Sequence, residues 1–220
     1  MQMSLKEEIV KVCHLVYQNK FVAAYDGNIS TRTESNSIII TRSGICKGDV
    51  TISDLLEIDL NGNKISGDGK ISTENKLHLF IYKKRKDARA VVHCHPVFTN
   101  ALGLVENQYL ENYFPEVLLT LGKIPICEYA TPSTEEVTNS IADFVESSNA
   151  LILKNHGAVT IGNSLMDAYY KMEKLEHAAK TILLAKAIGE PRKLSDNDID
   201  KLLSIAESTY GIKTNGKNIL

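Results

Sequence analysis

Two histidines separated by one residue end an apolar run, and they are the residues with the clearest chemical potential. His93 and His95 follow the stretch Ala90-Val91-Val92 and precede Pro96, so the run is predicted to be a strand that ends at the proline. Residues two apart in a strand project from the same face, which places both imidazoles side by side. Because histidine is the commonest metal-binding side chain, the pair is predicted to bind a metal ion.

A third histidine has a matching position at the end of another apolar run. His156 follows Leu151-Ile152-Leu153 and precedes Gly157. Three imidazoles with one exchangeable position are typical of catalytic zinc. We therefore expect His93, His95 and His156 to bind Zn²⁺, and another divalent transition metal would suit the same ligands. One such histidine alone is more often structural, so the prediction depends on all three lying together.

Two hydroxyl residues and a glutamate stand where a helix over residues 74–84 is predicted to begin. Ser72 and Thr73 are ordinary N-cap residues, and Glu74 is an ordinary acidic residue of a first turn. Alternatively, the helix N-terminus and the hydroxyls bind an anion such as phosphate, and Glu74 binds the metal or accepts a proton. The spacing of these residues does not decide between the two interpretations.

Two earlier polar segments adjoin predicted strands and expose backbone with little side-chain obstruction. The first is Tyr25-Asp26-Gly27-Asn28-Ile29-Ser30 and the second is Thr41-Arg42-Ser43-Gly44. Together with residues 69–74, they are predicted to form a cradle for a phosphate group.

The composition excludes several classes of protein. The chain has 220 residues, a hydrophobic content of 43% and a net charge of -2, so it can bury a substantial core and has no overall basic field for nucleic acid or an anionic membrane. The basic run at residues 83–86 is interpreted as the last turn of a helix. Four widely spaced cysteines without a Cys-x-x-Cys pair indicate free thiols. We expect a cytoplasmic protein.

Helices and strands alternate along the chain without a linker, which predicts one domain over residues 1–220. The expected fold class is α/β, a layered α/β/α arrangement with a central, largely antiparallel sheet. Predicted helices begin at Ser4-x-x-Glu7, Ser133-x-x-Glu136 and Ser195-x-x-Asp198, which are capping sequences. The other predicted elements are helices at 74–84, 97–105 and 165–188, and strands at 28–33, 37–41, 56–60, 64–66, 90–95 and 124–129, with two more around His156-Gly157.

Five of these segments, in this order, resemble the class II aldolase/adducin family over nearly the whole chain. The likeness is greatest to its aldolases for ketose 1-phosphates of the fuculose type. The segments that carry the resemblance are Gly27-Asn28-Ile29-Ser30, Thr41-Arg42-Ser43-Gly44, Ser72-Thr73-Glu74, His93-Cys94-His95-Pro96 and Asn155-His156-Gly157.

The resemblance implies a role for each matching residue. The three histidines match the zinc ligands, and Glu74 matches a carboxylate that binds zinc at rest and is displaced to act as acid and base. Tyr210 matches a tyrosine on a mobile tail that closes over the site. A homotetramer with sites at subunit contacts is also implied. The positions that match the phosphate-binding residues are Asn28, Ser43, Gly44, Ser72 and Thr73.

One position departs from the family pattern. Where the related aldolases place an active-site tyrosine lent by a neighbouring subunit, ungapped alignment places Phe114, with Tyr113 one residue earlier. A phenylalanine cannot donate a proton. Either Tyr113 takes over this role, or the chemistry on the aldehyde side differs.

The function expected from the resemblance is reversible cleavage of a ketose 1-phosphate to dihydroxyacetone phosphate and an aldehyde. Zinc would act as a Lewis acid, Glu74 as the base toward dihydroxyacetone phosphate, and Tyr210 as a proton donor to the aldehyde oxygen. The expected partner is therefore a small phosphorylated sugar.

Three alternatives share the scaffold. Pentulose-phosphate 4-epimerases of the family have an aspartate acid/base in the segment that corresponds to residues 107–121, which here contains Glu111 and Glu116 but no aspartate. A methylthioribulose-1-phosphate dehydratase is the second alternative. A non-catalytic adducin-like assembly module is the third, although such modules are not expected to retain the metal ligands. The remaining histidines are interpreted as structural, with His78 as a partly exposed helix residue.

Overall fold

The computed structural model describes residues 3–105, 110 and 112–211, apart from the side chain of Tyr210. Strands of this part of the chain form one sheet, in the order β4-β3-β2-β1-β5-β8-β7-β6. Neighbouring strands are antiparallel except β6 and β7, which are parallel. The strands are β1 (Asn28–Arg32), β2 (Ile38–Thr41), β3 (Leu55–Ile58), β4 (Lys64–Ser66), β5 (Ala90–Cys94), β6 (Ile126–Cys127), β7 (Ala150–Leu153) and β8 (Gly157–Gly162).

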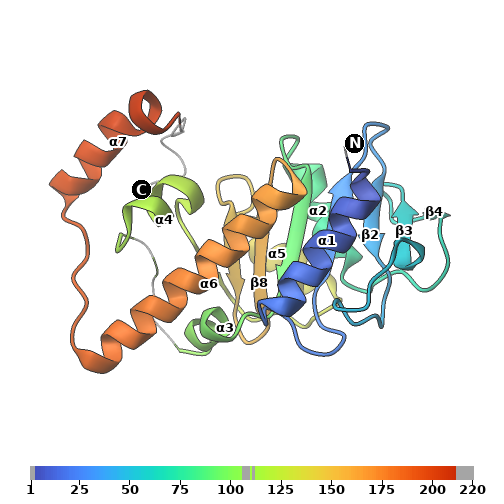
Figure 1. Cartoon of the computed structure of the whole chain (residues 1–220), viewed down its shortest axis with the longest axis horizontal. Coiled ribbons are helices and arrows are strands. Elements are labelled where there is room, and N and C mark those ends of the chain that lie inside the picture. The colour runs from blue at the N-terminus through green and yellow to red at the C-terminus, as the bar shows by residue number, and fades with distance from the viewer. Residues whose placement is uncertain (1–2, 106–109, 111, 212–220) are drawn as a thin grey trace.

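Helices cover both faces of this sheet, which confirms the predicted α/β class (Figure 1). One hydrophobic core joins the sheet to α1 and α6, and a second joins its other face to α2 and α5. The helices are α1 (Leu5–Gln18), α2 (Asn75–Lys84), α3 (Val97–Gly103), α4 (Pro115–Leu121), α5 (Glu135–Ile141), α6 (Leu165–Ile188) and α7 (Asp196–Tyr210), with a short 3-10 turn at Ile52–Asp54.

Strand β5 shows how the alternation of side chains places the functional residues. Val92 and Cys94 belong to the core under α1 and α6, whereas Val91 belongs to the core under α2 and α5. His93 is fully buried and alternates with Cys94, so it projects toward the α2 side of the sheet. Cys94 and His93 therefore lie on opposite faces of the sheet.

Most predicted helix starts agree with the structure. The capping box of Ser4 and Glu7 is present, and Ser195 accepts a hydrogen bond from the backbone of Asp198. The predicted cap of α5 was wrong, because Thr134 and not Ser133 accepts the bond at the helix start. Ser133 has a φ of 68° and its hydroxyl instead donates to Thr73 Oγ1.

Helix α4 was not predicted. Its start carries a recognisable signal, because Pro115 occupies the first turn, where a missing N–H costs nothing. The helix has only seven residues, too few for the apolar spacing to stand out. It packs against α7 through Leu118 and Ile199 at one end of the molecule (Figure 1).

Within the described ranges, none of the helices combines the length and the apolar character that crossing a membrane requires.

Candidate metal centre and active site

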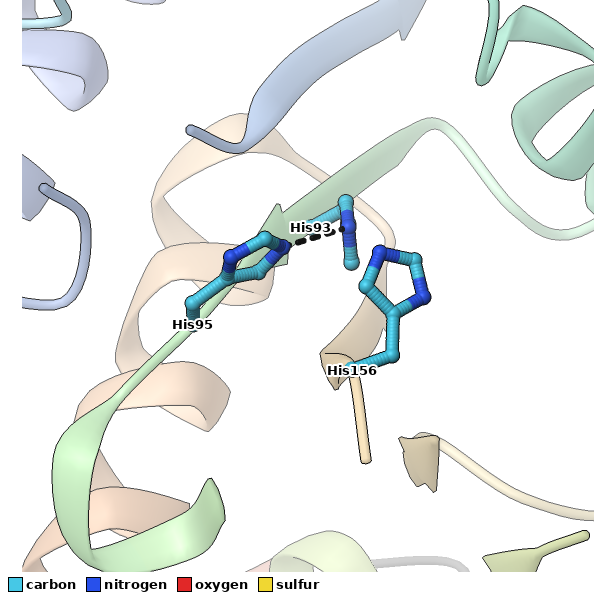
Figure 2. A group of neighbouring side chains, drawn as sticks. All are labelled: His93, His95 and His156. Atoms are coloured by element: carbon cyan, nitrogen blue, oxygen red, sulfur yellow. Dashed lines mark hydrogen bonds between the residues drawn. The ribbon is translucent and has the colours of Figure 1, made fainter. Parts of the chain in front are cut away.

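Three imidazoles meet at the end of β5 and the turn between β7 and β8 (Figure 2). His93 is the fourth residue of β5, His95 follows the strand, and His156 lies in the turn before β8. One ring nitrogen from each lies within 4.8 Å of the others. The Nε2 atoms of His93 and His95 are 3.2 Å apart. The structure thus brings the three predicted ligands together.

The spacing of the nitrogens fits a metal ion. A tetrahedral ion with metal–nitrogen bonds of about 2.0–2.1 Å separates its ligand atoms by about 3.3–3.4 Å. The separation of 3.2 Å between two imidazole nitrogens is close to that value. Gly157 makes this approach possible, since a Cβ at this residue would lie 2.6 Å from Cδ2 of His95 and 2.6 Å from the carbonyl oxygen of Cys94.

Neighbouring groups orient the imidazoles. Nδ1 of His93 donates to the carbonyl oxygen of Ala158 at 3.0 Å, which leaves the lone pair of Nε2 free for a metal. Asp26 Oδ2 lies 3.5 Å from His95 Nδ1. Asn100 Nδ2 donates to the backbone carbonyl of His156 at 3.3 Å. Asp26 belongs to a segment that was predicted to bind phosphate, but its contact with His95 was not predicted. Asn100 was not predicted as a site residue, because nothing in its sequence context distinguishes it from an ordinary helix residue.

Glu74 lies against the same imidazoles. Its Oε1 atom is 3.0 Å from His156 Nε2, and its Oε2 atom is 3.5 Å from His93 Nε2. These separations are close to the 3.2 Å between the two imidazole nitrogens, so the position of the carboxylate is compatible with the predicted role of Glu74 as a further ligand. The structure therefore favours the second of the two interpretations of Glu74, a carboxylate beside the metal centre.

Burial and neighbouring charges shift the pKa values of both Glu74 and His95. Burial raises the pKa of the Glu74 carboxyl, but the charges and hydrogen bonds of His93 and His156 outweigh it and hold the pKa below its ordinary value. Burial, followed by the charges of the two neighbouring imidazoles, lowers the pKa of His95 to about 4. The site thus holds an ionised carboxylate and a neutral His95, which are the forms that bind metals.

The three polar segments predicted to bind phosphate lie side by side. Arg42 forms an isolated antiparallel bridge with Ile71, and the backbone nitrogen of Ser43 donates to the carbonyl oxygen of Lys70 at 2.9 Å. The hydroxyl of Thr41 accepts a hydrogen bond from the backbone of Ile29 at 3.3 Å. These contacts bring the turn after β2 next to the start of α2 and the start of β1.

Within this cradle the predicted residues differ in accessibility. Gly44 is exposed, has a φ of 72° and has open space around it. Thr73 is exposed, whereas Ser72 is largely buried and its Oγ accepts from the backbone of Glu74 at 3.3 Å. Asn28 is buried and its Nδ2 atom donates to Glu74 Oε2 at 2.5 Å. The segments meet as expected, and their binding of phosphate stays a prediction.

His78 was wrongly predicted to be partly exposed. It is fully buried, with Nδ1 2.6 Å from Ser30 Oγ and Nε2 2.5 Å from Asn28 Oδ1. Its spacing of four residues from Glu74 on one helix face was the only sequence signal. Its burial depends on the packing of α2 against β1, which lies far away in the sequence.

The structure places two of the three candidate aromatic side chains, those of Tyr113 and Phe114, at the start of α4. Tyr113 precedes α4, and the Lys193 ammonium lies 5.6 Å from the centre of its ring. Phe114 is the N-cap of α4 and lines a groove of about 930 Å³ between α3, α4 and α6, which none of the three imidazoles lines. Tyr210 is the last residue of α7, and its side chain lies outside the described part. The catalytic roles of Tyr113 and Tyr210 stay predictions.

The fold and the site together define a protein class. Residues 7–183 match the family model of the class II aldolase and adducin N-terminal domain. The chain therefore belongs to the class II aldolase/adducin family.

Individual relatives show what the chain resembles within this family. An L-fuculose phosphate aldolase of Methanocaldococcus jannaschii is 37% identical over 179 residues, which cover 81% of this chain and 96% of the relative. A 3-oxo-tetronate 4-phosphate decarboxylase of Escherichia coli is 30% identical over 187 residues, with 83% and 88% covered. The crystal structure of YgbL from Klebsiella pneumoniae superimposes with a TM-score of 0.86 at 27% identity, covering 91% of this chain and 100% of YgbL.

Proposed function

We propose that the protein is a zinc-dependent aldolase that cleaves a ketose 1-phosphate, of the fuculose 1-phosphate type, reversibly to dihydroxyacetone phosphate and an aldehyde. The contact of Glu74 with two of three clustered imidazoles carries this proposal, because a carboxylate beside imidazoles that could bind a metal is suited to accept and return a proton. The similarity to L-fuculose phosphate aldolases supports the choice of substrate class. An adducin-like assembly module needs neither the imidazole cluster nor the glutamate.

The residues that would hold the metal are His93, His95 and His156, with Glu74 as a displaceable ligand. A bound Zn²⁺ supplies Lewis acidity, which stabilises negative charge on substrate oxygens during carbon–carbon bond cleavage. Because this charge has a stabilising cation, no lysine that forms a Schiff base is required.

The protein's own groups bind the substrate and move protons. The cradle of Asn28, Ser43, Gly44, Ser72 and Thr73 anchors the phosphate, which fixes the neighbouring ketone beside the imidazoles. In the condensation direction, Glu74 removes a proton from the hydroxymethyl carbon of dihydroxyacetone phosphate. Tyr210 or Tyr113 then donates a proton to the aldehyde oxygen as the new carbon–carbon bond forms.

Decarboxylation is the second candidate, and Phe114 favours it. The compound 3-oxo-tetronate 4-phosphate is a β-keto acid, and loss of its carboxyl group as CO₂ leaves the same three-carbon ketose phosphate. Aldol cleavage needs a base for the hydroxyl proton of the departing aldehyde, whereas CO₂ departs without one. Phe114 stands where related aldolases carry a tyrosine. A phenylalanine is compatible with the loss of CO₂, because that step needs no base for a departing aldehyde. The 30% identical decarboxylase supports this candidate.

Product analysis tests the two candidates. The zinc-loaded protein is incubated separately with L-fuculose 1-phosphate and with 3-oxo-tetronate 4-phosphate. The proposal predicts dihydroxyacetone phosphate together with lactaldehyde from the first compound, and no release after chelation of the metal. Release of CO₂ from the second compound without cleavage of the first would replace aldolase by decarboxylase. Return of an epimeric sugar phosphate or loss of water would likewise contradict the proposal.

A homotetramer with sites at subunit contacts is part of the same proposal. The groove of about 930 Å³ offers Phe98, Phe114 and Tyr170 on its walls, and Tyr170 is exposed. These aromatic side chains stand among charged ones such as Glu173 and Lys174, and a groove of this mixed character supports a contact with another copy. Such a contact would allow residues near α4 of one subunit to serve the active site of a neighbouring subunit.

A further inference from the structure

A chain of hydrogen bonds leads from Glu74 into the interior of the protein. Asn28 Nδ2 is 2.5 Å from Glu74 Oε2, and Asn28 Oδ1 is 2.5 Å from His78 Nε2. His78 Nδ1 is 2.6 Å from Ser30 Oγ, which in turn is 2.8 Å from Tyr82 Oη. Asn28 and Ser30 come from β1, and His78 and Tyr82 come from successive turns of α2.

The direction of every bond in this chain follows from the chemistry of its ends. An ionised carboxylate only accepts, so the Asn28 amide must present its NH₂ group to Glu74 and its oxygen to His78. That oxygen also only accepts, so Nε2 of His78 carries the hydrogen. In a neutral imidazole Nδ1 is then an acceptor, so the Ser30 hydroxyl donates to it and accepts from the Tyr82 hydroxyl.

Complete burial keeps His78 in this neutral form. His78, Ser30 and Tyr82 have no exposed surface, and Asn28 is 4% exposed. Burial, followed by the charge of His93, lowers the pKa of His78 to about 3, although the negative charge of Glu74 acts the other way. Burial also raises the pKa of Tyr82, so its hydroxyl remains a donor. All four groups have partners, as buried polar groups require.

We propose that His78 is a positioning residue that, backed by Ser30 and Tyr82, holds the Asn28 amide in the one orientation that donates to Glu74. This role rests on the proposed function, in which Glu74 alternates between the metal and the substrate. A rotated amide would place its oxygen against the carboxylate, and the resulting repulsion would move Glu74 from its place beside the imidazoles. With one Nδ2 hydrogen of Asn28 bound to Glu74 and its Oδ1 atom bound to His78 Nε2, the second Nδ2 hydrogen is available to the substrate.

The tautomer of His78 is the first test and needs no substrate. Nitrogen NMR of the zinc-loaded protein, labelled with ¹⁵N-histidine, distinguishes the two neutral tautomers and the imidazolium, and the His78→Gln variant assigns the signals. The proposal predicts a neutral imidazole with hydrogen on Nε2 throughout the neutral pH range. A hydrogen on Nδ1 alone, or a protonated ring at neutral pH, would overturn it.

Two amide replacements form the second test. The Nε2 atom of glutamine can take the place of the histidine Nε2 and donate to Asn28, whereas the shorter asparagine reaches only the Nδ1 position. His78→Gln is expected to keep kcat near the wild-type value. His78→Asn is expected to lower kcat by about 10- to 100-fold, as for other groups that orient metal-site residues, with a smaller change in KM.

Spectroscopy of the cobalt-loaded variants separates this role from simple packing. Absorption bands of bound Co²⁺ report the ligand arrangement, so the bands should change in His78→Asn and be preserved in His78→Gln, at similar unfolding midpoints. Equal spectra and equal kcat losses in both variants would overturn the proposal. Should the wild type cleave no sugar phosphate, the proposed function fails, while the tautomer and the cobalt spectra still decide the role of His78.

Discussion

Replacing Glu74 with glutamine is expected to lower kcat by about 10²- to 10⁴-fold, the usual contribution of a positioned acid/base. The amide keeps the size of the side chain but can neither accept a proton at neutral pH nor provide a charged ligand. Because three imidazoles remain, the variant should still bind the metal. Steady-state cleavage of the sugar phosphate measures kcat, and elemental analysis measures the metal content.

Glu146 provides the matched control, since it is an exposed glutamate whose Oε1 lies 3.7 Å from Nζ of the exposed Lys84. Glu146→Gln should leave both measurements unchanged. Near-normal turnover in Glu74→Gln would remove Glu74 from its role as acid/base. Loss of metal together with turnover would instead show that Glu74 acts mainly as a ligand.

The second large effect is expected for His95→Ala, which should lose its metal. Changing a residue that merely orients a ligand costs about 10- to 100-fold in metal affinity, and loss of a direct ligand is expected to exceed that range. Turnover should fall with the metal content. Competition with a chelator of known affinity measures the dissociation constant for zinc.

His177→Ala is the control for zinc affinity alone, because His177 is an exposed residue of α6 that lies outside the imidazole cluster and lines the groove proposed as a subunit contact. It should bind zinc as tightly as the wild type. Equal zinc affinity in His95→Ala and the wild type would mean that His95 is no ligand.

Local sequence carries enough information to predict the metal ligands. The alternation of a strand places His93 on one face, Pro96 marks where that strand ends, and Gly157 marks a turn directly after His156. Each of these signals acts over a few residues. The predicted cluster is accordingly present in the structure.

Long-range packing decides the features that were missed. His78 is buried only because α2 lies on β1, so its hydrogen bonds to Ser30 and Asn28 span about fifty positions of sequence. No periodicity within α2 reports which residue of β1 lies opposite. The contact of Asp26 with His95 likewise joins residues that are far apart in the sequence. An aspartate is common in turns, so its residue type does not indicate this contact.

The most direct test of the central claim is hydrogen exchange into dihydroxyacetone phosphate, the fragment common to aldol cleavage and decarboxylation. The zinc-loaded protein is incubated with dihydroxyacetone phosphate in D₂O, without aldehyde, and proton NMR follows the hydroxymethyl group. The account predicts that the protein catalyses loss of one carbon-bound hydrogen, and that chelation or Glu74→Gln abolishes this exchange. Absence of exchange in the metal-loaded wild type, or exchange at an undiminished rate after chelation, would contradict it.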